Sequence, residues 1–397
     1  MSEEKKVVCP FCFREVKVRR GQSCPATTKA IEAKKFEGIP CEGADGGIPI
    51  PDASFEGYKL FPIVVMGGQD AGKTVYLTAL AWALEHMQGW GEFWEVGKID
   101  YKGDPFAESM GKMFQDRTFP SMTHSEDKHY PLLRTLRMRR DPWISRKVAE
   151  RKLLLCFTDP AGENFHYEEK NAGELQKKYP VLNGHVKGAI AVMDPVEVNS
   201  QWAAKLDAYR GIISKRKRSR AADSLSALRL TGGQTKVPVA VCLVKFDELM
   251  GKNSPLPANE QIACEGVFRM DGCDTYQKEP GRFSWRDMQM GDQLLRSTFY
   301  ERSNDVVFTS LGVTIPEERT GPEVLWSAAT LRSASFRYHA FFGVSATGMG
   351  NTRIKMIGGQ RNVTLGDDPP KPFRVLDPLL WILWQHGYLW SAKGRTT

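Results

Sequence analysis

The sequence lacks any apolar run of the roughly 18 residues that a membrane-spanning helix needs. Its charged start, MSEEKK, also lacks the apolar centre of a secretion signal. It contains no internal repeat and no long low-complexity stretch, and no Ser/His/Asp or Cys/His constellation indicates nucleophilic catalysis. We therefore expect a cytoplasmic protein without a membrane span, in which disulfide bonds between the eight cysteines are disfavoured.

The composition is that of an ordinary globular protein, with 41% hydrophobic and 26% charged residues. A chain of 397 residues is long enough for two or three domains with a substantial buried core. Its formal net charge of +8 permits binding to nucleic acid or to an acidic membrane without requiring either. Much of the excess lies in SKRKRSR, residues 214–220, a pattern that is more typical of a solvated loop.

Four of the cysteines lie near the N-terminus, and they are Cys9, Cys12, Cys24 and Cys41. Cys9 and Cys12 form a C-x-x-C turn, in which two thiolates can converge on one Zn²⁺ ion that needs two further ligands. Cys24 and Cys41 are the candidates, although their irregular spacing leaves a partial or chance cluster as the alternative. We predict a zinc-binding module over residues 1–50, with a structural metal and a core separate from the rest of the chain.

The stretch GGQDAGKT, residues 67–74, has the pattern of a phosphate-binding loop. It follows the apolar run FPIVVM and precedes VYLTALAWAL, in which apolar residues recur at helical spacing. A strand, a glycine-rich turn and a helix N-terminus together surround phosphate with backbone amides, whereas the alternative is a chance match. Lys73 can reach the β- and γ-phosphates, and Thr74 can offer a hydroxyl to Mg²⁺. The predicted nucleotide contacts here are Gly67, Gly68, Gln69, Asp70, Ala71, Gly72, Lys73, Thr74 and Val75.

The segment RKLLLCFTDPAGENF supplies a partner strand for that loop. Its continuous apolar run indicates a strand covered on both faces, and Asp159 stands at the carboxyl end, where ligands bind in open α/β sheets. Behind a phosphate loop, we interpret Asp159 as a Mg²⁺-binding carboxylate and the backbone N–H of Gly162 as a sensor of the γ-phosphate. Glu163 can then act on water, but it lacks the N–H of an amide, which predicts slow or partner-dependent hydrolysis.

Two later apolar runs end in residues that suit a guanine base. VAVCLVKFDEL ends at Lys245 and Asp247, and the Asp247 carboxylate can accept from guanine N1–H and the 2-amino group while Lys245 covers the ring. YHAFFGVSATG ends at Ser345 and Ala346, and the backbone N–H of Ala346 can donate to guanine O6. Adenine offers the opposite pattern of donors and acceptors, so the set predicts GTP rather than ATP.

In this order, GGQDAGKT, DPAG, VKFD and SAT resemble the four nucleotide-contacting motifs of translation-factor-type (TRAFAC) P-loop GTPases, over residues 58–393. The segments HVKGAIAVMDP and RVLDPLLWIL are similar to the bacterial double-GTPase group of that class. The resemblance implies an α/β P-loop fold, with a mostly parallel sheet flanked by helices behind a zinc-ribbon-like module. It implies GTP hydrolysis with Mg²⁺, and a conformational switch that regulates a partner in a bacterial signalling or conflict system.

The resemblance also implies a switch threonine that binds Mg²⁺ upstream of the strand holding Asp159. RTFPSMTHSED offers Thr118 and Thr123, and we prefer Thr123 because HYPLLRTLRMRR after it suits an antiparallel edge strand. An ordinary loop hydroxyl is the alternative for Thr123. The implied catalytic residues are Lys73, Glu163 and Thr123.

One departure from the family pattern concerns the base. The VKFD motif begins with Val244 where the family usually has Asn, whose amide ties the motif to the phosphate loop. Base specificity is therefore open, and the zinc module and net charge favour a nucleic-acid-dependent ATPase as the second hypothesis. A nucleotide-bound scaffold with negligible turnover, which docks a protein through its zinc module, is the third.

The chain between these motifs is far longer than a single βα connection. The predicted insertions in the domain 58–393 span about residues 88–128 and 255–335. We expect a protein partner to bind through the zinc module or through these insertions. The stretch LLWILWQHGYLW near the C-terminus predicts a buried closing helix, with an exposed partner surface as the alternative.

Overall fold

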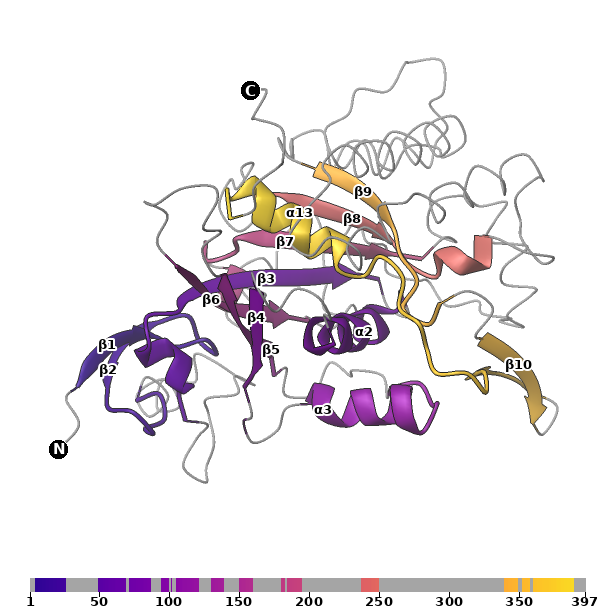
Figure 1. The fold of residues 1–397 in the computed structure, drawn as a ribbon, viewed down its shortest axis with the longest axis horizontal. Helices are drawn as coiled ribbons and strands as arrows, with labels where there is room; N and C mark the ends of the chain where they lie inside the picture. Colours follow the sequence, from indigo (N-terminus) through magenta and orange to yellow (C-terminus); the bar gives the residue numbers. More distant parts are fainter. Residues whose placement is uncertain are drawn as a thin grey trace, which may run out of the picture.

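A computed structural model of the chain describes residues 4–25, 49–68, 71–86, 94–99, 101, 105–120, 130–138, 150–159, 180–182, 184–194, 237–249, 339–348, 352–357 and 360–388. These residues form a mixed α/β structure around one seven-stranded sheet (Figure 1). None of the helices in these ranges has the length and apolar character needed to cross a membrane.

The seven-stranded sheet is mostly parallel, as the sequence predicts. Its strands are β3 (Lys59–Gly67), β4 (Trp94–Lys98), β5 (Leu132–Met138), β6 (Arg151–Thr158), β7 (Gly188–Met193), β8 (Val239–Leu243) and β9 (His339–Gly343). They lie in the order β4-β5-β6-β3-β7-β8-β9, with β3 parallel to both of its neighbours. Strand β5 runs opposite to the other six strands of this sheet, since it pairs antiparallel with both β4 and β6. The carboxyl ends of β3, β6, β7, β8 and β9 therefore meet along one edge of the sheet.

The antiparallel strand expected after Thr123 is confirmed as β5, but its expected place at the sheet edge is wrong. Strand β4 pairs with the outer side of β5, with Trp94 opposite Met138. A Cβ at Gly97 would lie 2.3 Å from the Thr135 hydroxyl, so the missing side chain lets β4 lie against β5 here. That hydroxyl donates to the Gly97 carbonyl at 3.2 Å.

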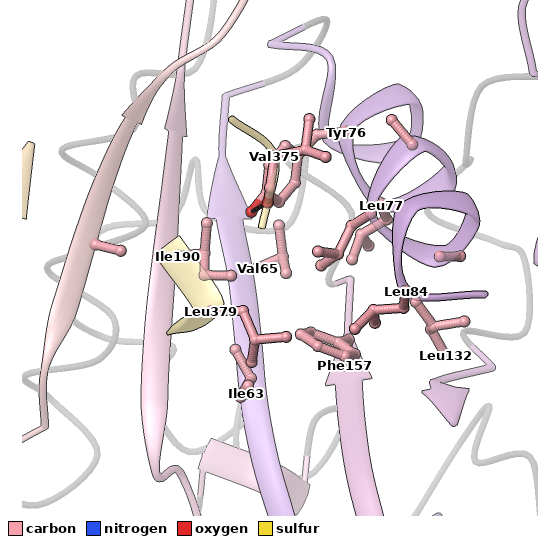
Figure 2. Close-up of a cluster of buried hydrophobic side chains, with 14 of the residues drawn as sticks. Ile63, Val65, Tyr76, Leu77, Leu84, Leu132, Phe157, Ile190, Val375 and Leu379 are labelled. Carbon is pink, nitrogen blue, oxygen red and sulfur yellow. Dashed lines mark hydrogen bonds between the residues drawn. The ribbon is translucent and has the colours of Figure 1, made fainter. Parts of the chain in front are cut away.

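Both faces of the sheet are buried, as expected of parallel strands. Along β3, Ile63 and Val65 point to one face while Val64 and Met66 point to the other, and all four are fully buried. Helices α2 (Lys73–Glu85) and α13 (Asp377–Gln385) pack on the face that carries Ile63 and Val65 (Figure 2). Side chains of the two helices meet over β3, which makes one continuous core.

Helix α2 is buried around most of its circumference, because Thr78, Ala79 and Ala81 are buried as well as the apolar residues at helical spacing. Tyr76, Leu77, Leu80 and Leu84 are at most 1% exposed, and burial of each leucine stabilises the fold by about 1.5–3 kcal/mol. The Tyr76 hydroxyl donates to the carbonyl of Val375 at 3.0 Å, which ties α2 to the segment before α13.

Helix α13 is the buried closing helix predicted at the C-terminus. Pro378 in its first turn suits a helix start, and the next five residues, Leu379 to Leu383, are at most 1% exposed. A Cβ at Gly188 on β7 would lie 2.5 Å from the Ile382 side chain, so this glycine permits close packing of α13 on the sheet. The alternative of an exposed partner surface is wrong for this part of the stretch.

A buried ion pair joins the end of α2 to β5. Arg134 is fully buried, and its Nη2 lies 2.6 Å from Oε1 of Glu85, the last residue of α2. The Nη1 atom donates to the carbonyl of Leu133 at 2.7 Å. Because a buried charge without its partner is costly, this pair fixes α2 against the sheet.

The smaller elements lie outside the sheet. They are β1 (Lys5–Val8), β2 (Glu15–Val18), η1 (Asp52–Phe55), α3 (Pro105–Met110), η2 (Gly111–Gln115), η5 (Pro180–Leu182), η6 (Phe246–Leu249), β10 (Thr352–Ile357) and β11 (Gln360–Leu365). β1 pairs with β2, and β10 pairs with β11, each as an antiparallel hairpin. Strand β4 and helix α3 come from the stretch 88–128, whereas the predicted insertion at 255–335 lies outside the described residues.

Candidate functional site

The predicted phosphate-binding loop joins the carboxyl end of β3 to the start of α2, in the expected strand–loop–helix order. Gly67 ends β3, and a Cβ there would lie 2.4 Å from the backbone oxygen of Val192 on β7, so glycine is required. Gly72 caps α2 with a φ of 92°, a left-handed conformation that favours glycine. Gln69 and Asp70 lie outside the described residues.

Lys73 is the first residue of α2, and its side chain turns back into the loop. Its Nζ atom donates to the carbonyls of Gly67 at 3.2 Å and Gly68 at 3.0 Å, and the residue is 8% exposed. The ammonium group therefore lies at the N-terminus of a helix of 13 residues. Charge and helix dipole both favour an anion at this position.

Two of the predicted Mg²⁺ ligands, Thr74 and Asp159, are among the described residues, and they lie side by side. Thr74 follows Lys73 in α2, and Asp159 directly follows β6, the neighbour of β3 in the sheet. The Thr74 hydroxyl donates to Oδ2 of Asp159 at 3.4 Å. Residues that are far apart in the sequence thus place two oxygen donors beside the loop.

The environment of Asp159 fits a divalent cation. The residue is 7% exposed, and its Oδ1 atom has no hydrogen-bond partner among the described residues. Burial raises the pKa of this carboxyl to about 6, although Lys73 and the Thr74 hydrogen bond act in the opposite direction. Mg²⁺ prefers hard oxygen ligands, and an ion here would satisfy the buried carboxylate.

Several predicted site residues lie outside the described residues, namely Thr123, Gly162 and Glu163. Val75 is described, and its side chain packs against the core of the sheet and helices.

The residues predicted to contact the base also come together. Asp247 lies in η6 after β8, and Ser345 lies in the loop after β9, the neighbouring strand. The Ser345 hydroxyl lies near enough to the Asp247 carboxylate to oppose the rise of its pKa, and it accepts from the backbone N–H of Gly348 at 3.0 Å. Burial raises the pKa of Asp247 to about 6, against the effect of the Ser345 hydrogen bond. Ala346, next to Ser345, is partly exposed.

The loop after β8 reaches the phosphate loop through apolar contacts. A Cβ placed on Gly72 would lie 3.8 Å from Cγ2 of Val244 and 3.7 Å from Cε of Lys245. Val244 is buried and donates its backbone N–H to the carbonyl of Met193 at 3.0 Å. The Val244 side chain thus lies near Gly72 of the predicted phosphate loop.

An ion pair at this edge was not predicted as part of the site. Nζ of Lys245 lies 2.5 Å from Oδ2 of Asp194, the residue that follows β7. Asp194 is buried, whereas Lys245 is partly exposed. The only signal in the sequence is an aspartate at the end of an apolar run, which does not identify its partner.

Three of the four N-terminal cysteines converge. The sulfur atoms of Cys9, Cys12 and Cys24 all lie within 4.8 Å of one another, and those of Cys12 and Cys24 are 3.7 Å apart. The hairpin of β1 and β2 forms the turn, in which Phe13 has a φ of 58° and donates its N–H to the Cys9 carbonyl at 2.8 Å. Three buried thiols in this arrangement suit a metal such as Zn²⁺, while Cys41 lies outside the described residues.

The cysteine turn also contacts the large sheet, although the apolar cluster around that sheet contains none of its residues. The Cys156 thiol on β6 donates to the carbonyl of Pro10 at 3.4 Å. The ring of Phe11 meets that of Tyr101 at 5.7 Å, and the ring of Phe13 stacks on His185 at 5.7 Å. The hairpin buries valines of its own strands, and two of its aromatic residues also meet residues of the larger unit.

Comparisons with known proteins leave the family open. No family model matches the chain, and no curated protein matches it. Among solved structures, the GTPase-like domain of Ski7 from S. cerevisiae, bound to GTP, matches at 14% sequence identity with a TM-score of 0.29. The match covers 85% of this chain and 51% of that chain, so this chain spans about half the length of that protein. So distant a likeness assigns neither a ligand nor a reaction.

Proposed function

We propose that the chain is a GTP-binding protein that hydrolyses GTP in a Mg²⁺-dependent reaction. The supporting observation is that two groups of polar side chains lie along the same edge of the sheet. Lys73, Thr74 and Asp159 suit a triphosphate with its cation. Asp247 and Ser345 suit a guanine base.

In the part of the site that binds phosphate, positively charged groups are in position before the nucleotide binds. Lys73 and the backbone amides at the start of α2 neutralise the β- and γ-phosphates, and their fixed position avoids reorganisation during the reaction. Thr74 and Asp159 would hold Mg²⁺, which when bound neutralises developing charge on the phosphate oxygens. Asp159 binds a cation when it is deprotonated, so pH values above about 6 favour loading of the site.

The hydrolytic half of the proposal extends to residues outside the described ranges. Glu163 acts on the attacking water, Gly162 donates its backbone N–H to the γ-phosphate, and Thr123 adds a ligand to the cation. Each follows the motif pattern of the sequence. Since Glu163 lacks an amide N–H, hydrolysis is slow until a partner completes the site.

In the part of the site that binds the base, the Asp247 carboxylate recognises guanine. Its two oxygens accept from guanine N1–H and the 2-amino group, and the nearby Ser345 hydroxyl favours the ionised carboxylate against the effect of burial. The Ala346 N–H donates to guanine O6, and the aliphatic part of Lys245 covers the ring. Adenine would leave the carboxylate facing an acceptor, which is why this arrangement favours GTP over ATP.

The biological setting is proposed from the motif pattern alone. The chain acts in the cytoplasm as a switch of the bacterial double-GTPase group and regulates a partner in a signalling or conflict system. The partner binds through the cysteine module or through the insertions at about 88–128 and 255–335. Zn²⁺ held by Cys9, Cys12, Cys24 and Cys41 stabilises that module.

A nucleic-acid-dependent ATPase is the second candidate, and Val244 is the observation in its favour. In that protein the base site would not discriminate, and nucleic acid would stimulate turnover. A nucleotide-bound scaffold would bind GTP without hydrolysing it. Binding preference and turnover therefore separate the three functions.

Equilibrium binding of a fluorescent GTP analogue to the full chain tests the proposal. Lys73→Ala is expected to weaken binding by about 100-fold, because it removes charge-assisted bonds to two phosphates. Lys112→Ala is the matched control, since Lys112 pairs with Glu108 in an exposed ion pair away from the loop. Wild-type affinity in a folded Lys73→Ala protein would rule out nucleotide binding at this loop.

A further inference from the structure

The ion pair between Asp194 and Lys245 spans two neighbouring strands at the edge where the base site lies. Asp194 follows β7 and Lys245 follows β8, and their charged atoms are 2.5 Å apart. Asp194 is 5% exposed, so its carboxylate is largely shielded from solvent. In such surroundings an ion pair is screened little and holds its geometry better than a surface pair does.

The backbone of Lys245 is held in an unusual conformation. Its φ of 54° is left-handed, a conformation that is unfavourable for a residue with a side chain. Hydrogen bonds on both sides maintain it: Val244 N–H donates to Met193, Phe246 N–H donates to Val344, and Glu248 N–H donates to Lys245 itself. The backbone conformation and the ion pair with Asp194 therefore both determine the direction of the Lys245 side chain.

The side chain of Lys245 passes Gly72 of the phosphate loop. Its Cε lies beside Gly72, 3.7 Å from where a Cβ would be, and its Nζ continues to Asp194. Val244 gives only an apolar contact at the same glycine. An apolar side chain has no preferred direction, so Val244 adds no directional contact with Gly72 to the backbone hydrogen bonds of the loop after β8.

We propose that Asp194 is a positioning residue for guanine recognition, and that its bond to Lys245 takes the part of the missing polar tether. By holding Lys245 over Gly72, Asp194 fixes the start of η6, the short helix that contains Asp247. The carboxylate of Asp247 then reaches the edge of the base while the phosphates of the same nucleotide lie in the loop. This inference rests on the proposed function, since it assigns a role within the same nucleotide site.

Asp194→Asn tests the inference, because it removes the charge at nearly constant volume. Dissociation constants for GTP, ATP and inorganic tripolyphosphate are measured by competition with the fluorescent GTP analogue. The expected result is a fall in the preference for GTP over ATP by about tenfold or more, with tripolyphosphate affinity within about twofold of wild type. Asp194→Glu should restore part of the preference, because it restores the charge.

Two further variants separate positioning from general stability. Lys245→Met keeps the apolar stem over the base but removes the ammonium group. If Asp194 acts through that group, the double variant Asp194→Asn/Lys245→Met should lose no more of the preference for GTP over ATP than either single variant does. Asp368→Asn alters an exposed carboxylate and should change nothing. Thermal unfolding of each variant verifies that it is folded.

The outcomes distinguish the two levels of the proposal. If wild type prefers GTP and Asp194→Asn keeps that preference, the positioning role is refuted and the proposed function stands. If Asp194→Asn weakens GTP, ATP and tripolyphosphate equally, Asp194 has a structural role only. A wild-type protein that binds neither GTP nor tripolyphosphate refutes the proposed function and the inference with it.

Discussion

The buried carboxylate of Asp159 is expected to destabilise the nucleotide-free protein at neutral pH. Burial raises its pKa from the ordinary 3.8 to about 6. The folded state therefore binds this proton more tightly than the unfolded chain, and stability falls as the pH rises from about 4 to about 6. Each factor of ten in the ionisation constant is worth about 1.4 kcal/mol, so the cost above pH 6 is roughly 2–3 kcal/mol.

Asp159→Asn removes this charge at nearly constant volume. In EDTA and without nucleotide, we expect the free energy of unfolding in urea to rise by about 2 kcal/mol at pH 7.5, and by less than half of that at pH 4.5. Asp116→Asn, at an exposed aspartate, is the matched control and should have no effect at either pH. With saturating GTP and Mg²⁺ the order should reverse, because wild type gains more from the ligand. An Asp159→Asn protein that is no more stable than wild type at pH 7.5 would refute this reasoning.

Three further predictions concern the base, the metal and the core. Asp247→Asn should lose GTP affinity by about 100-fold and gain affinity for xanthosine triphosphate in a competition titration, because the amide N–H complements the 2-carbonyl of xanthine. Freshly purified protein should contain one zinc per chain by metal analysis. Cys9→Ser should lower the urea midpoint of the main unfolding transition, because Phe11 packs against Tyr101 in the larger unit. Glu85→Ala should lower the free energy of unfolding by about 3 kcal/mol, because the guanidinium of Arg134 stays fully buried without that carboxylate, whereas an apolar pair at both positions should recover most of that loss in the same urea assay.

The strand–loop–helix unit around Gly67 and Gly72 could be predicted because its signals are local. A glycine is required at Gly67 by the approach of β7 and at Gly72 by a left-handed φ, and both requirements are visible as glycines in the sequence. The apolar run before the loop and the helical spacing after it predict β3 and α2. The place of Asp159 follows from one further rule, that ligands gather at the carboxyl ends of parallel strands.

The edge of the sheet could not be predicted in the same way. The sequence WEVGK of β4 is short and half polar, so nothing local distinguishes it from a loop. Its position depends on Gly97, whose missing side chain makes room for Thr135 on a strand far along the chain. Such pairings are set by tertiary contacts rather than by local propensity.

The same limit applies to the ion pair and to the cysteine turn. An aspartate after β7 and a lysine after β8 are each visible, but the sequence does not show that their charged atoms meet. The C-x-x-C spacing predicts convergent thiols, yet the packing of Phe11 and Phe13 on the sheet depends on Tyr101 and His185. Contacts between distant residues are therefore where the structure adds to the sequence.

Single-turnover hydrolysis tests the central claim most directly. An excess of full-length protein is mixed with γ-labelled GTP or ATP, with and without Mg²⁺ and with and without nucleic acid, and the release of phosphate is followed over time. We predict that phosphate is released from GTP faster than from ATP, that release requires Mg²⁺, and that nucleic acid has no effect. Release from ATP that equals or exceeds release from GTP and increases with nucleic acid would contradict the account, as would the absence of release from either nucleotide.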